Sequence, residues 1–300
     1  MIKIIDPHLH LFDLNKGCYH WLKSENPPFW PDKNIIAKNF SEQDLTLSSP
    51  LTLTGFVHIE AGFDNEQPWR EIAWLEDTCT QPFRSIAMLD ITLPKALFSQ
   101  QLDKLMHYQS VVGIRYILDD HALAILSAKN SQDNLSLLSD KKLSFELQMP
   151  LDNTPAVNSL ITLLQATPDL LLCINHAGWP TLDYAQDNAQ DKAQDKEQGN
   201  NQATPWLENL QRLAKFSRVF IKCSGYEMAD RYYPQSWQHK IIQLCIESFG
   251  ITRVMLASNF PLSLWHASYQ DTWLTHTELP YSNEQLQQLC FSNAEQFYKF

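Results

Sequence analysis

The chain has 300 residues, 44% of them hydrophobic and 19% charged, which is enough for a large core without disulfides or a structural metal. Its 23 Lys and Arg against 34 Asp and Glu give a formal net charge of −11. A body this acidic repels phosphate backbones and anionic lipid, so we expect neither nucleic acid nor a membrane as a partner. Too few apolar residues precede Asp6 for us to expect a signal peptide, and the six cysteines include no C-x-x-C pair. These features predict a cytoplasmic protein with reduced thiols.

Short apolar runs alternate with helix-like segments, which is typical of β/α units around a parallel sheet. Most runs are apolar on consecutive residues, as expected of strands covered on both faces. Because there are eight runs, we predict an α/β fold, a single (β/α)8 TIM barrel in one domain over residues 1–300. The predicted strands are residues 2–6, 52–60, 84–89, 111–118, 143–149, 170–176, 219–224 and 253–258.

Helical periodicity is clearest at residues 69–79, 95–108, 155–166, 206–216 and 236–249. A last helix has its apolar side chains on one face from Leu286 to Phe297. Ser282 and Gln285 lie three residues apart just before this face. This spacing predicts a capping box at the start of the C-terminal helix.

Two segments interrupt the alternation, and both follow strand ends on the face where such barrels build their active sites. Residues 11–32 are rich in aromatic residues and proline, and we expect them to form a lid. Residues 183–202 repeat Ala-Gln-Asp and are too polar to bury a face. We expect this second segment to be an exposed insertion without a role.

His8 and His10 end the first apolar run with an i, i+2 spacing that places both rings on one side of a strand. Two histidines placed in this way can begin a divalent-metal site if other strand ends supply more ligands. The alternative is a pair of hydrogen-bonded polar side chains at a strand end.

Polar side chains also end the other predicted strands. Each alone has a structural explanation: Asp90 could cap the next helix, Gln148 could satisfy a backbone amide, and Lys222 could point outward. Together they predict a ring of active-site residues at one mouth of the barrel. The ring comprises His58, Glu60, Asp90, Arg115, Gln148, His176, Lys222, Ser224, Ser258 and Asn259.

Several of these strand ends belong to longer motifs in a fixed order. They are Asp6-Pro7-His8-Leu9-His10, Tyr19-His20-Trp21-Leu22, Val57-His58-Ile59-Glu60-Ala61 with Trp74-Leu75, Gly113-Ile114-Arg115, Asn175-His176-Ala177-Gly178-Trp179-Pro180, Lys222-Cys223-Ser224-Gly225 and Ser292-Asn293-Ala294-Glu295-Gln296-Phe297-Tyr298. Their order and spacing resemble the amidohydrolase superfamily, in the amidohydrolase-2 branch of TIM-barrel hydrolases and lactonases. The resemblance extends over nearly the whole chain.

Two positions depart from the pattern of that family. Asn259 stands in Ser-Asn-Phe-Pro where the family usually has Ser-Asp-Trp-Pro, and an amide cannot act as the general base. Gln148 stands where many metal-dependent relatives have histidine. The resemblance therefore leaves two states open, a divalent metal, zinc being the most suitable, or a metal-free site whose former ligands bind substrate. The metal ligands it implies are His8, His10, His176 and Glu60.

The resemblance and the residues together predict a hydrolase of a lactone or related carboxylic ester of a small oxygen-rich acid. The predicted partner is this small-molecule acid or lactone, and the oligomeric state is unknown. The predicted catalytic residues are His8, His10, Glu60, Asp90, His176 and Asn259, with Glu60 or Asp90 as the base. The predicted substrate-binding residues are Arg115, whose guanidinium can grip two oxygens at once, Gln148, Trp21, Trp179 and His58. The alternatives are a non-oxidative decarboxylase and a catalytically inactive ligand-binding barrel.

Overall fold

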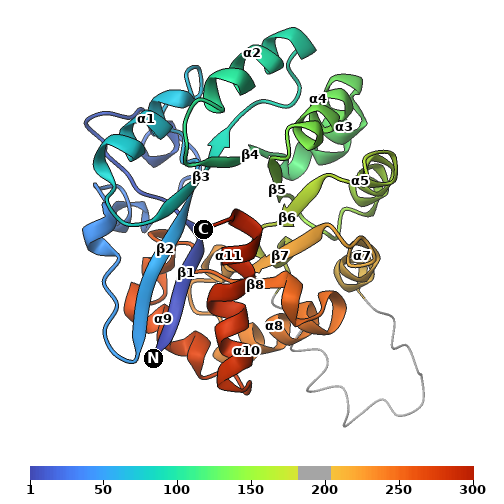
Figure 1. Cartoon of the computed structure of the whole chain (residues 1–300). Helices are drawn as coiled ribbons and strands as arrows, with labels where there is room; N and C mark the ends of the chain where they lie inside the picture. The colour runs from blue at the N-terminus through green and yellow to red at the C-terminus, as the bar shows by residue number, and fades with distance from the viewer. Residues whose placement is uncertain (182–203) are drawn as a thin grey trace, which may run out of the picture.

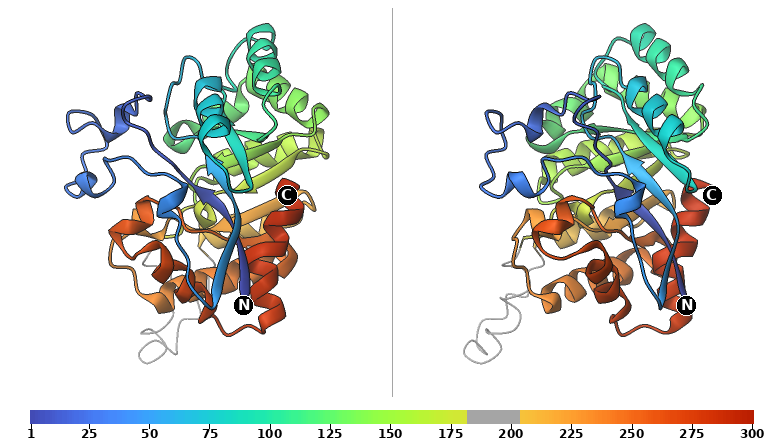
Figure 2. Two further views of the ribbon diagram at one scale, coloured as in Figure 1. Left: turned by 60° about the vertical axis from the view of Figure 1, so that its left-hand side comes forward. Right: turned by 90° about the vertical axis from the view of Figure 1, so that its left-hand side faces the viewer.

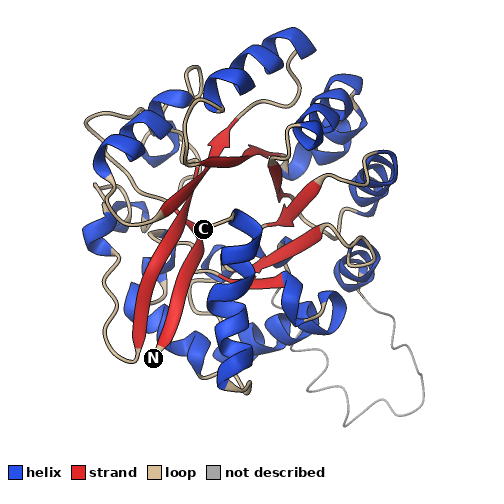
Figure 3. Ribbon diagram, in the orientation of Figure 1, coloured by secondary structure: helices blue, strands red, loops and turns tan. Residues whose placement is uncertain are grey.

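The computed structural model describes residues 1–181 and 204–300, and the predicted insertion at 183–202 lies outside the described residues. Eight parallel strands form one sheet in the order of the chain, and they enclose a barrel (Figure 3). The prediction of a (β/α)8 TIM barrel is confirmed. The strands are β1 (Ile2–Leu9), β2 (Leu51–Ile59), β3 (Phe83–Met88), β4 (Val111–Ile117), β5 (Ser144–Gln148), β6 (Leu171–Ile174), β7 (Val219–Cys223) and β8 (Val254–Leu256).

The barrel closes where the first strand meets the segment after the last. Leu9 forms a parallel bridge with Phe260, and the backbone N–H of Asn259 donates to the carbonyl of His8 over 2.9 Å. Every strand runs parallel to its neighbours, so all eight carboxyl ends open on the same face. This arrangement brings the polar strand ends of the sequence together.

Helices surround the sheet and bury its outer face (Figure 1). In α2, for example, Phe98 and Leu102 lie on the buried apolar side. None of the helices in the described part of the chain is long and apolar enough to cross a membrane. The α-helices described are α1 (Trp69–Thr78), α2 (Lys95–Leu105), α3 (Ala122–Ser127), α4 (Lys129–Asp140), α5 (Thr154–Ala166), α7 (Pro205–Leu213), α8 (Gln235–Phe249), α9 (Tyr269–Thr277), α10 (Asn283–Gln287) and α11 (Asn293–Tyr298).

The C-terminal helix lies against the amino ends of the strands (Figure 1). It begins with the predicted capping box of Ser282 and Gln285, and a π-helical turn at Gln288–Ser292 joins α10 to α11. Phe297 and Tyr298 pack with apolar side chains from inside the barrel. The hydroxyl of Tyr298 donates to Glu146 over 2.6 Å, so this helix closes the barrel at the end opposite the polar strand ends.

The connection between β1 and β2 stands to one side of the barrel (Figure 2). It contains short 3-10 turns, and a bridge between Phe12 and Phe40 ties its two ends together. Asp32 forms an ion pair with Arg231 of the loop after β7 over 2.9 Å. The aromatic segment is therefore fixed to the loop after β7, on the same face of the barrel.

Candidate active site

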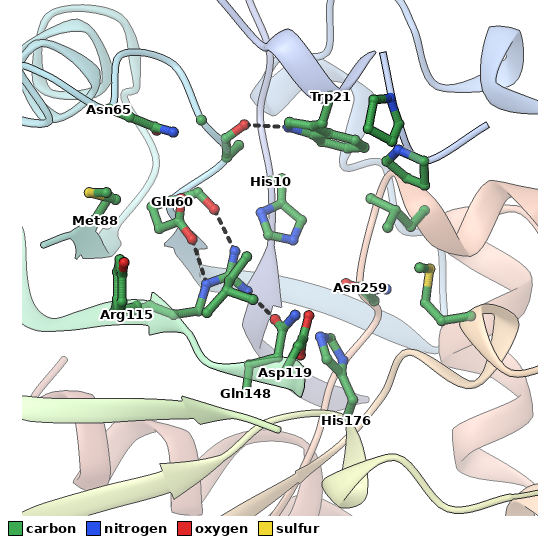
Figure 4. A pocket seen from close by; sticks show the side chains of 18 of the residues that line it. His10, Trp21, Glu60, Asn65, Met88, Arg115, Asp119, Gln148, His176 and Asn259 are labelled. Atoms are coloured by element: carbon green, nitrogen blue, oxygen red, sulfur yellow. Dashed lines mark hydrogen bonds and ion pairs between the residues drawn. The ribbon is translucent and has the colours of Figure 1, made fainter. Parts of the chain in front are cut away.

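A cavity of about 720 Å³ opens at the carboxyl ends of the strands. Eight of the predicted site residues line it: His10, Trp21, Glu60, Arg115, Gln148, His176, Trp179 and Asn259. Figure 4 shows the side chains of His10, Arg115, His176 and Asn259 around the same space. These residues come from six different strand ends and two loops, so only the folded barrel unites them.

Three histidine rings lie together on one side of the cavity. The ring centroid of His8 is 5.2 Å from that of His10 and 4.5 Å from that of His176. His8 is fully buried, does not line the cavity, and has no hydrogen-bond partner for either ring nitrogen. Burial, the largest cause, and neighbouring positive charges lower the pKa of all three rings well below the usual range. The rings are therefore neutral at physiological pH.

The hydrogen bonds of two rings decide what they present to a ligand. Nδ1 of His10 lies 2.8 Å from the carbonyl oxygen of Ile59, which can only accept, so this nitrogen carries the proton of the neutral ring. Nε2 of His10 is then a bare acceptor. Nδ1 of His176 lies 3.1 Å from the hydroxyl of Ser224, which can donate or accept, so either tautomer of His176 fits.

Arg115 in β4 organises the opposite side of the cavity. Its Nε donates to Oε1 of Glu60 over 2.7 Å, and one terminal nitrogen donates to the Glu60 carbonyl over 2.7 Å. The other terminal nitrogen donates to Gln148 over 3.1 Å. Three of the five N–H donors of the guanidinium are thus used, and two remain. Glu60 therefore occupies part of the set of N–H donors that was predicted to bind two substrate oxygens.

Asp119 also lines the cavity, two residues after the end of β4. Burial raises the pKa of this carboxyl, while a hydrogen bond from Gln148 and the charge of Arg115 act in the opposite direction. Its Oδ1 is buried without a hydrogen-bond partner. Our sequence analysis did not include Asp119, although its position just after a strand end was a usable signal.

Asn259 lines the cavity beside a second carboxylate that the sequence analysis missed. The Asn259 side-chain N–H donates to Glu227, which is buried in the short helix after β7. Burial raises the pKa of Glu227 to about 7, although the hydrogen bond from Asn259 acts against this rise. The amide oxygen of Asn259 is left without a partner. Glu227 lies three residues beyond Ser224, the last residue of this strand end in the predicted ring. No motif in its local sequence marked it.

Aromatic side chains and proline form the outer wall. Trp21, Pro27, Pro28 and Trp30 from the predicted lid segment all line the cavity. The indole N–H of Trp21 donates to the carbonyl of Ala61 over 2.7 Å, which fixes its ring against the loop after β2. These contacts place apolar faces above the polar floor.

Three predicted site residues do not line the cavity, and we correct them: His8, whose burial is described above, His58 and Asp90. His58 is fully buried; its Nδ1 accepts from the N–H of Leu11, and its Nε2 lies 3.1 Å from Glu71 in α1. The i, i+2 spacing would place His58 and Glu60 on the same side of a continuous strand. β2 ends at Ile59, so this alternation does not extend to Glu60. Asp90 does not line the cavity either.

Asp90 has a structural partner, although it does not cap the next helix as its alternative interpretation proposed, since Pro94 is the N-cap of α2. One carboxylate oxygen accepts from both the N–H and the hydroxyl of Thr92, each over 2.7 Å, in the turn before α2. It is therefore not the catalytic base. Two other residues of the predicted ring also serve the scaffold: Lys222 forms a fully buried ion pair with Glu146 over 2.8 Å, and Ser258 hydrogen-bonds Asp6.

Comparison with known proteins agrees with this geometry. The family model described as amidohydrolase matches residues 5–300. The chain belongs to the amidohydrolase family.

An uncharacterised protein from Sinorhizobium fredii is 26% identical over 99% of both chains. Among solved structures, an amidohydrolase from Burkholderia multivorans with bound zinc superposes with a TM-score of 0.76, at 18% identity over 99% of both chains. A Pseudomonas putida protein, provisionally named a 2-pyrone-4,6-dicarboxylic acid hydrolase, gives 0.71 at 17% identity over 100% of this chain and 98% of that one. Decarboxylases also share the fold.

The metal site expected for an amidohydrolase does not fit the residues present. Among the side chains described, no group of three or more His, Cys, Asp or Glu is arranged to hold a metal ion. Arg115 engages the carboxylate of Glu60, and Asn259 offers a neutral amide where a carboxylate ligand was expected. The predicted ligand set of His8, His10, His176 and Glu60 is therefore corrected, and we assign no chemical step to a metal.

Proposed function

We propose that this amidohydrolase hydrolyses the ester bond of a small lactone. The observation that carries the proposal is the pairing of Glu60 with Arg115 at the cavity wall. Oε1 of Glu60 accepts from Arg115, and among the described residues no hydrogen bond engages its Oε2. A carboxylate oxygen for deprotonating water and guanidinium N–H groups for polarising a carbonyl thus lie side by side.

The reaction would use these groups in one sequence. The remaining N–H donors of Arg115 bind the carbonyl oxygen of the lactone and stabilise the negative charge that develops there. Glu60 takes a proton from water as the water oxygen bonds to the carbonyl carbon. When the carbon–oxygen bond of the ring breaks, the leaving oxygen takes that proton and a hydroxy acid is released.

The neutral histidines would orient the reactants. The bare Nε2 of His10 accepts a hydrogen bond from the attacking water or from a substrate hydroxyl. The wall of Trp21 and Trp30 supplies an apolar face for the lactone ring and excludes bulk water.

Decarboxylation, the alternative, is less well supported by the site. Loss of carbon dioxide leaves a carbanion whose charge must be stabilised, and a substrate carboxylate must first be bound. Arg115 is the single Lys or Arg side chain among the described residues that line the cavity, and it is already paired with Glu60. We therefore favour lactone hydrolysis over decarboxylation.

A screen of aldonolactones and unsubstituted lactones with a pH indicator tests the proposal. Hydrolysis releases one acid per turnover, and we expect Glu60→Gln to lower kcat by roughly 10²- to 10⁴-fold. Glu247→Gln, an exposed change of the same chemistry on α8, serves as the control. Ligand binding without acid release by the wild-type protein would support the inactive barrel instead.

A further inference from the structure

The charges of the cavity restrict the lactone that it can accept. In the described part of the lining, the positive charge of Arg115 stands against the carboxylates of Glu60 and Asp119. Glu60 already forms an ion pair with Arg115 over 2.7 Å. The lining therefore has no cation left to pair with a substrate carboxylate, and Asp119 adds an anion that lacks an ion-pair partner.

Asp119 is built into the cavity wall. Its backbone has a φ of 33°, a conformation that costs energy in a residue other than glycine and that occurs often at functional sites. Gln148 accepts from Arg115 and also acts to lower the pKa of the Asp119 carboxyl, so one amide lies beside both charged groups. Oδ1 of Asp119 is buried and has no partner. A carboxylate at the wall of a cavity gains most from a ligand that donates a hydrogen bond.

We propose that Asp119 makes the site selective for uncharged, hydroxyl-bearing lactones and rejects lactones that carry a carboxylate. This inference rests on the proposed function. A hydroxyl on the ring can donate to the Asp119 carboxylate, whereas a carboxylate at the same place offers only acceptors and brings two anions into contact. In a partly desolvated cavity that repulsion is much stronger than in water.

The inference separates this chain from a protein that shares its fold. The Pseudomonas putida structure is named for a dicarboxylic acid, and two carboxylates on one ring would need cationic partners. At 17% identity the likeness concerns the fold alone. The Glu60–Arg115 pair and Asp119 give this cavity the opposite charge preference.

A matched pair of substrates tests the inference. An aldonolactone and the corresponding aldarolactone differ only by a carboxylate in place of a hydroxymethyl group. We expect the wild-type protein to prefer the aldonolactone in kcat/KM, and Asp119→Asn to shift that preference toward the aldarolactone by roughly tenfold or more. Asp120→Asn removes the same charge from the exposed neighbouring residue and should leave the preference unchanged.

Asp119→Glu keeps the charge and should keep the rejection of the aldarolactone, even where its altered length lowers overall activity. Equal preferences in the Asp119→Asn and Asp120→Asn proteins would overturn the inference. So would a wild-type protein that hydrolyses both lactones equally well.

Calorimetry with hydroxylated lactams, with and without a ring carboxylate, separates this inference from the proposed function. Their ring amides resist hydrolysis, so the experiment measures binding alone. Selective binding of the uncharged lactam without any lactone hydrolysis would overturn the proposed function and support the role of Asp119. Hydrolysis of lactones with no discrimination between the lactams, or binding of neither lactam, would overturn the role of Asp119.

Discussion

The side-chain amide of Asn259 donates a hydrogen bond to the buried carboxylate of Glu227. This contact gives a physical reason for an amide at a position where amidohydrolases usually carry aspartate. An aspartate here would face Glu227 directly, and two buried carboxylates in contact cannot both be ionised without a large cost. The pair also fixes the amide, so that its oxygen is the atom left unpartnered.

Asn259→Asp should therefore destabilise the protein, because it replaces a donor by a second carboxylate. We expect a loss of about 3 kcal/mol in the free energy of unfolding at pH 8, the size typical of an uncompensated buried charge. The loss should shrink toward pH 5, where one proton can be shared. Urea denaturation at both pH values measures the effect, and an unchanged midpoint at pH 8 would contradict it.

Glu227→Gln should remove part of the pH dependence of stability. The pKa of Glu227 is about 7 in the folded protein against an ordinary 4.5, so the folded state binds more protons between these values. The contribution of Glu227 to the free energy of unfolding is present in full below pH 4.5 and is lost as the pH rises to about 7. The side chain in Glu227→Gln is neutral and still accepts from Asn259. The stability of this variant should therefore not fall over this pH range for that reason. Thermal unfolding from pH 4.5 to 8 in both proteins gives the difference.

Arg115→Lys should abolish most activity although the positive charge is kept. An ammonium group cannot reproduce the planar set of N–H donors that reaches Glu60 and Gln148 together, so both side chains lose their positions. We expect kcat/KM for the best lactone to fall roughly 10²-fold or more. Arg70→Lys, at an exposed pair with Asp64 outside the cavity, is the control. Equal activity in the two variants would make Arg115 structural only.

Chelation should leave lactone hydrolysis unchanged. The predicted ligand side chains do not form a metal-binding group, and Glu60 is engaged by Arg115. Mass spectrometry of the purified protein, with rates before and after treatment with a chelator, measures metal content and activity together. Stoichiometric zinc whose removal stops the reaction would refute this expectation.

The fold could be predicted because each strand carries its own signal. Apolar runs such as residues 111–118 and 219–224 match β4 and β7 within one residue, and parallel strands in sequence order follow from short β/α units. The helices α3, α4 and α9 were missed. The sequence of α3 is apolar but only six residues long, whereas that of α4 is largely polar, with Leu135 and Leu138 as a narrow apolar stripe. Tertiary packing decides such helices.

The site could be predicted only in part. Residues at strand ends, such as His10 and His176, were found because barrel geometry places such ends together. Glu227 lies in a loop whose path depends on tertiary packing, and no spacing rule marks it, whereas Asp119 follows the end of β4 closely enough to have been found. The partners of Arg115 were equally hidden, because hydrogen bonds between residues 55 positions apart leave no local pattern.

Closure of the barrel by Tyr298 sets the route by which reactants can move. With the amino ends of the strands filled by the C-terminal helix, the interior offers no passage through that end. Substrate and product would then share the entrance lined by Trp21 and Trp30. A hydroxy acid that is slow to leave past these rings would block the next lactone, so release of product can limit turnover even when the ester bond breaks quickly.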